Sequence, residues 1–185
     1  MNVIATTGPA GAGKDTVADF LVMRYGYVKM SMAGPLKAGM AAMGFPEPIN
    51  RDDKEKIIPG FDFTWREAAQ RLGTEWGRGL DPDIWVKAMA LRCRRSTDRI
   101  VISDVRFENE AEMVRSIGGR VLHIRGRSVN LGANGAHASE AGVTVDERDG
   151  VIDNSGNFEE TKKQVISCLV LTCERRLAHT YGNKP

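Results

Sequence analysis

The sequence has little net charge, few cysteines and no long apolar run. Its 26 Lys and Arg residues against 24 Asp and Glu give a formal net charge of only +2, which is too small to indicate a nucleic-acid-binding surface. Cys93, Cys168 and Cys173 are odd in number and fit no metal-ligand spacing, so we expect reduced thiols in a cytoplasmic protein. We find no secretory core and no span of about 20 apolar residues, so we expect no membrane insertion.

The chain also lacks the usual marks of several domains. It contains no long linker, no low-complexity tract and no internal repeat. A length of 185 residues suits one domain with one substantial core. We therefore expect residues 1–185 to fold as a single domain.

A phosphate-binding loop lies close to the first residue. The apolar run Val3–Thr6 predicts a buried strand, and apolar residues at helical spacing follow Thr16. Between them lies a G-x-x-x-x-G-K pattern, for which strand, glycine-rich turn and helix are the required context. The glycines let several N–H groups point at one anion in front of a helix N-terminus, and the lysine adds a full positive charge. The predicted phosphate-binding residues are Gly8, Ala10, Gly11, Ala12, Gly13, Lys14, Asp15 and Thr16.

The residue after the loop lysine departs from the usual pattern. Ser or Thr normally stands there and ligates Mg²⁺, but this chain has Asp15, with the hydroxyl one position later at Thr16. This order indicates a variant kinase loop and not a GTPase or motor loop. Asp15 either holds magnesium through water or positions Lys14 and a substrate. Asp15 and Thr16 are the predicted metal ligands.

Four further strands are predicted downstream, over residues 27–31, 99–104, 120–125 and 150–154. Residues 99–104 are apolar until they end in an acid, as in a parallel strand buried on both faces. Helical segments alternate with the strands. Right-handed crossovers then give an α/β fold, in which a parallel sheet is covered by helices on both faces in three α/β/α layers.

Residues 33–96 interrupt this alternation with a helical insertion. Pro35 suits the first turn of a helix that ends near Met43. Residues 44–63 hold several prolines among charged residues, and so long an irregular segment is either a substrate-covering loop or a solvated excursion. A second irregular stretch, residues 126–142, is rich in Gly, Ala, Asn and Ser and is predicted to be a lid.

Two more helices with apolar faces are predicted within the insertion. One begins after Thr64, its expected N-cap, and the other begins at Asp81 and Pro82. A short glycine-containing turn joins them, which predicts an antiparallel pair. Trp85, on the second helix, is either a core residue or a ligand platform. The first helix has an apolar stripe made of Trp65, Ala68, Ala69, Leu72 and Trp76.

Charged residues follow the strand at 99–104. Ligands of parallel sheets bind beyond the carboxyl ends of the strands, which puts Asp104 and Arg106 beside the phosphate loop. Asp104 is a magnesium-side or substrate-side carboxylate or, alternatively, a helix N-cap. Arg106 and Glu110 lie four residues apart at the start of a helix, so they either serve the site or form a surface ion pair.

With these residues assembled, the chain resembles the phage-type deoxynucleoside monophosphate kinases, which are P-loop kinases related in fold to adenylate and dephospho-coenzyme A kinases. The similarity runs over nearly the whole length. The loop alone is specific only to phosphate binding, whereas the ordered set of motifs is specific to this family. The motifs are Gly13-Lys14-Asp15-Thr16, Ala33-Gly34-Pro35 with Lys37, Leu72-Gly73-Thr74-Glu75, Trp85-Val86-Lys87, Ser103-Asp104-Val105-Arg106 with Glu110, His137-Ala138-Ser139-Glu140 and Ile152-Asp153-Asn154-Ser155-Gly156.

The resemblance implies five parallel strands in the nucleoside monophosphate kinase order, a substrate-binding insertion and a lid. It implies ATP as donor, Mg²⁺ as cofactor and a deoxynucleoside monophosphate as acceptor. It also suggests a homodimer, in the host cytoplasm if the chain is phage-encoded. The implied catalytic residues are Lys14, Asp104, Arg106 and Arg125. The implied substrate-binding residues are Lys37, Arg66, Trp85, Asp104, Arg106 and Glu110, and Asn154 is implied to lie near adenine.

The loop departs from the family at three small residues, Ala10, Gly11 and Ala12, where a relative can carry basic ones. This departure leaves the positive charge of the site to a few residues outside that part of the loop. They are Lys14, Arg106 and Arg125.

Two other functions compete with this interpretation. A dephospho-coenzyme A kinase or another small-molecule P-loop kinase has the same fold. A nucleotide-binding switch or a DNA-stimulated ATPase belongs to a different class. Against that class, the chain has no paired acidic motif ending an apolar strand, no guanine-reading N-K-x-D and no basic stripe with interleaved aromatics. The predicted partners are therefore small nucleotides, with no nucleic acid and no membrane.

Overall fold

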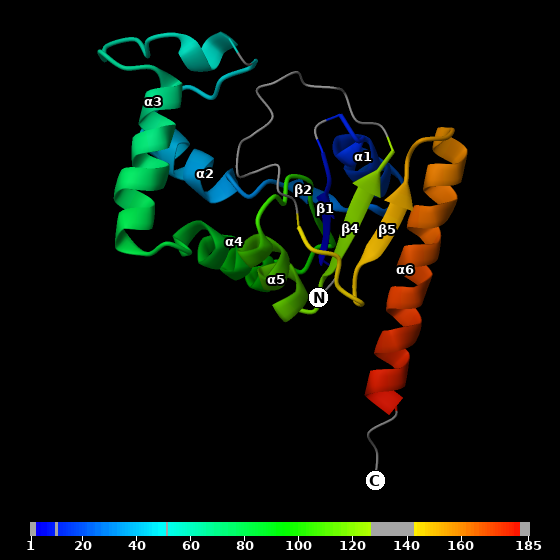
Figure 1. Cartoon of the computed structure of the whole chain (residues 1–185). Helices are drawn as coiled ribbons and strands as arrows, with labels where there is room; N and C mark the ends of the chain where they lie inside the picture. Colours follow the sequence, from blue (N-terminus) through cyan, green and yellow to red (C-terminus); the bar gives the residue numbers. More distant parts are fainter. Residues whose placement is uncertain (1–2, 10, 51, 127–142, 182–185) are drawn as a thin grey trace. The chain divides into compact units, whose positions relative to one another are not determined.

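The computed structural model describes residues 3–9, 11–50, 52–126 and 143–181 (Figure 1). The chain divides into two compact units. The sheet unit runs up to Met30 and resumes at Ser96, and the helical unit is Ser31–Arg95. Loop residue Ala10, nearly all of the predicted lid at 126–142 and its His137–Glu140 motif lie outside the described residues.

The sheet unit contains five parallel strands in the order β2-β3-β1-β4-β5. The central strand β1 pairs with β3 on one side and with β4 on the other, so that Ala5 lies opposite both Ile102 and Val121. The predicted five-stranded parallel sheet is confirmed. The strands are β1 (Val3–Thr7), β2 (Val28–Met30), β3 (Ile100–Ile102), β4 (Arg120–Arg125) and β5 (Gly150–Asp153).

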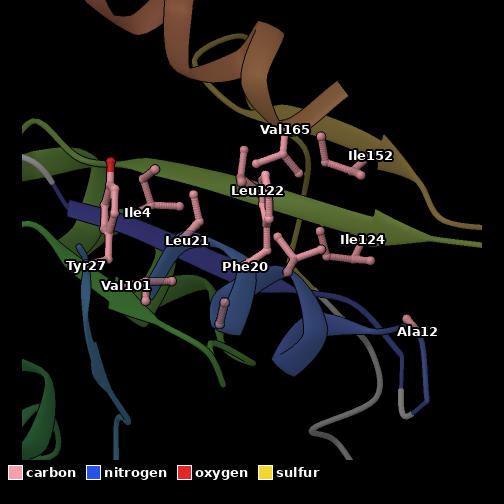
Figure 2. Close-up of a cluster of buried hydrophobic side chains, with 12 residues drawn as sticks. Ile4, Ala12, Phe20, Leu21, Tyr27, Val101, Leu122, Ile124, Ile152 and Val165 are labelled. Carbon is pink, nitrogen blue, oxygen red and sulfur yellow. The ribbon is translucent and has the colours of Figure 1, made fainter. Parts of the chain in front are cut away.

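Helices cover both faces of this sheet, which confirms the predicted three layers. Helices α1 (Lys14–Tyr25) and α6 (Phe158–Tyr181) pack on one face, and α5 (Glu108–Ser116) packs against β1 and β4 on the other. Figure 2 shows the core under α1 and α6, where alternate residues of the strands meet the buried faces of both helices. Its members include Ile4, Phe20, Leu21, Leu122, Ile124, Ile152 and Val165. Among the described residues, no helix is long and apolar enough to cross a membrane.

The helical unit follows several of the sequence signals. Pro35 stands in the first turn of α2 (Gly34–Ala42), as predicted. Thr64 caps α3 (Trp65–Gln70) in a reciprocal capping box with Glu67, which confirms the predicted N-cap. Helix α4 (Ile84–Arg95) begins after Asp81, whose carboxylate accepts a hydrogen bond from the backbone N–H of Asp83.

The prediction of one regular helix from Trp65 to Trp76 was wrong. After α3 the backbone widens into a π-helix, η2 (Arg71–Arg78). The apolar stripe assumed α-helical periodicity, and the wider turn of a π-helix shifts later residues off that stripe. Trp76 accordingly leaves the core and is 55% exposed.

The predicted antiparallel packing of these helices was also wrong. Within the helical unit, Figure 1 shows α3 with η2 crossing α4 steeply instead of running back along it. The corner is filled by Trp85, whose indole packs against Gly77 so closely that a Cβ on Gly77 would lie 2.5 Å from the ring. The absence of a side chain at Gly77 lets the indole of Trp85 pack at this corner.

Residues 44–63 are irregular and largely exposed, as predicted, but part of the segment is packed, and a role in covering a substrate stays a prediction. They include the short 3₁₀-helix η1 (Asp52–Glu55). Phe45, Phe61 and Phe63 contact one another, with ring centroids 5.0–6.0 Å apart. The segment thus folds on a small core of its own, which also contains Met40, Ile58 and Trp65.

Candidate active site

The turn between β1 and α1 requires glycine at two positions that the sequence marked. Gly8 has φ 141°, and a Cβ there would lie 2.3 Å from the carbonyl oxygen of Ile124. Gly13 has φ 97° and occupies the N-cap position of α1. Both φ values lie where L side chains are strained, so larger residues would have to change the path of the loop. Gly11, with φ 76°, continues the same turn.

Lys14 is the first residue of α1 and folds back over this loop. Its ammonium donates to the carbonyl oxygens of Gly8 at 2.7 Å and Pro9 at 2.8 Å. These bonds use two of the three N–H donors of an ammonium and leave one for an anion. The helix N-terminus adds partial positive charge at the same place.

Asp104 and Arg106 both act electrostatically on Lys14, as expected for residues that follow a neighbouring strand. Burial and then the Arg106 guanidinium lower the pKa of Lys14 below 10.5, while the carboxylates of Asp15 and Asp104 oppose this shift. Two cations close enough to affect each other's titration are stabilised together when a phosphate binds beside them. Asp104 and Arg106 follow β3, which pairs with β1 next to the phosphate loop, and their role in the site stays a prediction.

Glu110 has a local partner that the sequence did not reveal. Its carboxylate accepts hydrogen bonds from the backbone N–H groups of Arg106 at 2.8 Å and Phe107 at 3.2 Å. It therefore satisfies donors at the start of α5, where a negative charge is favourable. Glu110 thereby fixes the backbone that carries Arg106.

Asp15 is held by a residue that the sequence interpretation missed. Lys29 of β2 bridges Asp15 at 2.8 Å and Asp19 at 2.9 Å. Burial alone would lower the pKa of Lys29, but its hydrogen bonds to the two carboxylates raise it above 10.5. The spacing of Asp15 and Asp19 could have indicated this pair of bonds. Carboxylates four residues apart share one face of a helix, so a single cation on the next strand can bind both.

Asn154 lies at the loop, but its amide groups are used inside the protein. Its Nδ2 donates to the carbonyl of Ala12 at 2.8 Å, and its Oδ1 accepts from Thr161 at 2.8 Å. Its side chain is buried, with a relative exposure of 5% for the residue. The resemblance implied that Asn154 lies near adenine, and a contact of its side chain with the base would compete with both of these bonds. Arg125 ends β4 in an exposed position, and its carbonyl accepts the backbone N–H of Asn154 at 2.8 Å.

The remaining predicted substrate residues belong to the helical unit. Lys37 lies on α2 and is half-buried. Arg66 of α3 forms an ion pair with Glu55. The indole N–H of Trp85 donates to the carbonyl oxygen of Gly73 at 2.8 Å, which satisfies a carbonyl of the π-helix. Their grouping with the phosphate loop stays a prediction.

The oxygen donors near the loop suit a metal ion that arrives with a nucleotide. Among the described residues, no group of three or more His, Cys, Asp or Glu side chains is arranged to hold a metal ion. Mg²⁺ fits such a site because it keeps several waters and takes most other ligands from substrate phosphates. Thr16 is exposed next to the loop lysine, and Asp15 and Asp104 add hard carboxylate oxygens.

Solved structures of kinases share this fold. A gluconokinase from Sinorhizobium meliloti superposes with a TM-score of 0.55 at 14% identity, covering 97% of this chain and 98% of that chain. A sugar kinase from Janibacter superposes with a TM-score of 0.51 at 18% identity, covering 91% of this chain and 94% of that chain. At these identities the likeness concerns the fold alone.

The sequence comparisons identify the family more specifically than the comparison of folds. The family model for deoxynucleotide monophosphate kinase matches residues 49–165. A protein of Acanthamoeba polyphaga mimivirus assigned as a deoxynucleotide monophosphate kinase is 30% identical over 190 residues, covering 91% of this chain and 96% of the viral protein. The deoxynucleotide monophosphate kinase of Enterobacteria phage T4 is 26% identical over 242 residues, covering 91% of this chain and 99% of the phage protein. The chain therefore belongs to the deoxynucleotide monophosphate kinase family.

Proposed function

We propose that the protein transfers the γ-phosphoryl group of ATP to a deoxynucleoside monophosphate, giving a deoxynucleoside diphosphate and ADP. The observation that carries this proposal is the phosphate loop, where Lys14 at the N-terminus of α1 lies over the carbonyls of Gly8 and Pro9 in a chain of this family. A chain of this family with that arrangement has the cations needed to hold two phosphorylated substrates.

The reaction does not require a strong general base. The second pKa of a phosphate monoester is about 6, so the attacking oxygen of the acceptor is mostly ionised near pH 7. The obstacle is to bring two anions into line while charge spreads over the transferred group. Positioning and cationic stabilisation therefore dominate the catalysis.

The residues of the sheet unit take separate roles in this proposal. Lys14 contacts the transferred phosphoryl group, Arg106 binds the acceptor phosphate, and Arg125 contributes from the end of β4 when the predicted lid closes. Asp104 is assigned to the acceptor side, where its carboxylate offsets the positive charge of Lys14. Glu110 holds the start of α5 and so positions Arg106.

Magnesium would be held by Thr16, Asp15 and Asp104, directly or through water. It supplies neutralisation of the β- and γ-phosphate oxygens. Lys29 keeps the Asp15 carboxylate in place next to the loop lysine. For the acceptor, Lys37 and Arg66 are the proposed phosphate contacts from the helical unit. Trp85 is the proposed contact for the base, and because its N–H is already bonded to Gly73 this contact would be made by the ring carbons.

An acceptor panel tests the function directly. Purified full chain with ATP and MgCl₂ is offered dAMP, dGMP, dCMP, dTMP, the corresponding ribonucleotides and dephospho-coenzyme A, and ADP release is followed. We expect release that depends on a deoxynucleotide acceptor. Activity on dephospho-coenzyme A alone, or acceptor-independent hydrolysis stimulated by DNA, would replace this proposal with one of its competitors.

Two substitutions test the assigned residues. We expect Lys14→Ala and Arg106→Ala each to lower kcat by about 10³-fold or more, because each removes a cation from the transferring groups. Arg148→Ala is the matched control, since Arg148 forms a half-exposed pair with Asp146. Melting temperatures should match the wild type. A folded variant of Lys14 or Arg106 with near-normal turnover would contradict the assignment.

Three further points stay predictions for this protein. The chain is expected to form a homodimer, which the mass in solution would test. It is expected to act in the cytoplasm, and to bind neither nucleic acid nor membranes.

A further inference from the structure

A buried polar bridge joins the phosphate loop to the far edge of the sheet. Asn154 follows the edge strand β5, and Thr161 lies in the first turns of α6, where it is 0% exposed. The Thr161 hydroxyl donates to Asn154 Oδ1, and Asn154 Nδ2 donates to the carbonyl of Ala12, both at 2.8 Å. Figure 2 shows Ala12 on the loop between β1 and α1, where it forms part of the buried cluster of the core. The Asn154 side chain thus links Thr161 of α6 to Ala12 of the phosphate loop through two hydrogen bonds.

The direction of each bond in this bridge is fixed. A carbonyl oxygen can only accept, so the Nδ2 end of the amide must face Ala12. The Oδ1 end must then face Thr161, whose hydroxyl can donate. The backbone N–H of Asn154 is bonded to the carbonyl of Arg125 at 2.8 Å, which anchors Asn154 to β4. The backbone of Asn154 is therefore fixed by Arg125, and its side-chain amide is fixed by Thr161.

The bridge determines how one loop peptide is oriented. The Ala12–Gly13 peptide is trans, so its C=O and N–H point in opposite directions. When Nδ2 holds the carbonyl of Ala12, the N–H of Gly13 is turned the other way, away from the Asn154 amide. Gly13 lies so close to the amide that a Cβ on it would be 2.3 Å from Nδ2.

We propose that Asn154, oriented by Thr161, is a positioning residue that sets the Ala12–Gly13 peptide so that the Gly13 N–H binds an ATP phosphate. This inference rests on the proposed ATP-dependent function and assigns Asn154 to the phosphates and not to adenine. A loop that cradles phosphate depends on several N–H groups converging on one anion. A reversed peptide would present a carbonyl oxygen to that anion and repel it.

The two assignments of Asn154 make different predictions about the ligand. An adenine contact would affect ATP but not a phosphate chain without a base. An oriented peptide affects every polyphosphate alike. Binding of MgATP and of magnesium tripolyphosphate to the full chain, measured by calorimetry, therefore separates them.

We expect Thr161→Val to weaken binding of both ligands about tenfold, because it leaves Asn154 Oδ1 buried without its donor and frees the amide to turn. Thr161→Ser keeps the hydroxyl and should restore binding to within about threefold of the wild type. Thr64→Val is the control. It removes a helix cap in the helical unit at a comparable cost in stability, and should leave binding of both ligands unchanged.

Asn154→Asp gives a second test that keeps the size of the side chain. A carboxylate cannot donate to the carbonyl of Ala12, whereas a protonated carboxyl can. We expect the ratio of variant to wild-type Kd for tripolyphosphate to be about tenfold at pH 8 and to fall toward one as the pH is lowered to 5. A ratio that does not change with pH would contradict the role in peptide orientation.

Other outcomes are equally decisive. The inference is overturned if folded Thr161→Val binds both ligands like the wild type. It is also overturned if that variant loses ATP affinity and keeps tripolyphosphate affinity, which would return Asn154 to adenine. If the wild type binds both ligands, responds to the substitutions as expected and phosphorylates no deoxynucleotide, the proposed function fails while the role of Asn154 stands.

Discussion

Replacing Arg115 by alanine would remove the central cation of a buried ion-pair network in the sheet unit. The side chain of Arg115 on α5 is only 2% exposed, and that of its partner Asp149 is 0% exposed. The guanidinium donates to Asp149 at 2.7 and 3.2 Å, to Glu108 at 2.6 Å and to the carbonyl of Thr144 at 2.9 Å. These bonds hold the segment that leads into β5 against α5.

The expected loss is large because a carboxylate stays behind. Breaking a buried pair by removing one partner costs about 3–5 kcal/mol, most of it from the uncompensated charge. In a chain of this size 1 kcal/mol shifts Tm by about 2–4 °C, so Arg115→Ala should lower Tm by roughly 6–20 °C. Arg148→Ala, in a pair that is half-exposed, should cost about 1 kcal/mol or less.

The pKa of Asp149 determines how the stability difference between wild type and Arg115→Ala changes with pH. Burial alone would raise the pKa of Asp149, but hydrogen bonds from Arg115, from the backbone of Asp146 and from His123 hold it below 3.8. A lowered folded-state pKa contributes stability above the unfolded value, and that stability is lost as the pH falls through the folded pKa. In Arg115→Ala, burial raises the pKa of the stranded Asp149 carboxyl, so this carboxyl becomes neutral at a higher pH than in the wild type. The stability gap between wild type and Arg115→Ala should therefore narrow steadily as the pH falls from 7 to 3.

Urea unfolding at pH 7 and thermal unfolding from pH 7 to pH 3 would measure both quantities. Three observations would refute the reasoning: a loss below about 1 kcal/mol at pH 7, a loss equal to that of Arg148→Ala, or a gap that does not change with pH. Asp149→Asn in the Arg115→Ala background should recover part of the loss, because it removes the buried charge.

Two further substitutions give sharp expectations. Gly77→Ala should lower the free energy of unfolding in urea by about 1–3 kcal/mol, because the new Cβ would lie 2.5 Å from the Trp85 ring. A Cβ on Gly79 meets nothing within 4 Å, so Gly79→Ala should be neutral or stabilising. Equal effects of the two substitutions would contradict the close packing of Trp85 on Gly77. Lys29→Met should raise the KM for MgATP roughly fivefold, a loss of about 1 kcal/mol, because Asp15, a proposed magnesium ligand, loses the cation that holds it. A KM equal to that of the wild type would show that Lys29 does not position Asp15.

The strands and the phosphate loop could be predicted because their signals are local. Val3–Thr7 and Arg120–Arg125 are apolar runs that end at polar or glycine residues, and their bounds in the structure agree with the sequence. Thr64 could be identified as an N-cap because its partner Glu67 lies three residues away. The loop glycines could be identified because their spacing with Lys14 is a pattern in itself.

What could not be predicted depends on partners far along the chain or on a change of helix type. The bond of Asn154 to Ala12 joins residues 142 positions apart, so no local pattern indicates it. Trp76 was assigned to the core because an α-helical period was assumed, and the π-helix displaced it. Lys29 gave no signal by itself, and only its pairing with two helix carboxylates shows its role.

The order of the strands has a consequence for how such enzymes can diversify. The loop that follows β1 is flanked by β3, which leads to Asp104 and Arg106, and by β4, which ends at Arg125. Under the proposed roles, the acceptor residues Asp104 and Arg106 and the lid-side Arg125 therefore reach the loop from opposite neighbours. Substitutions after β3 can then change the choice of acceptor without altering the strand that carries Arg125.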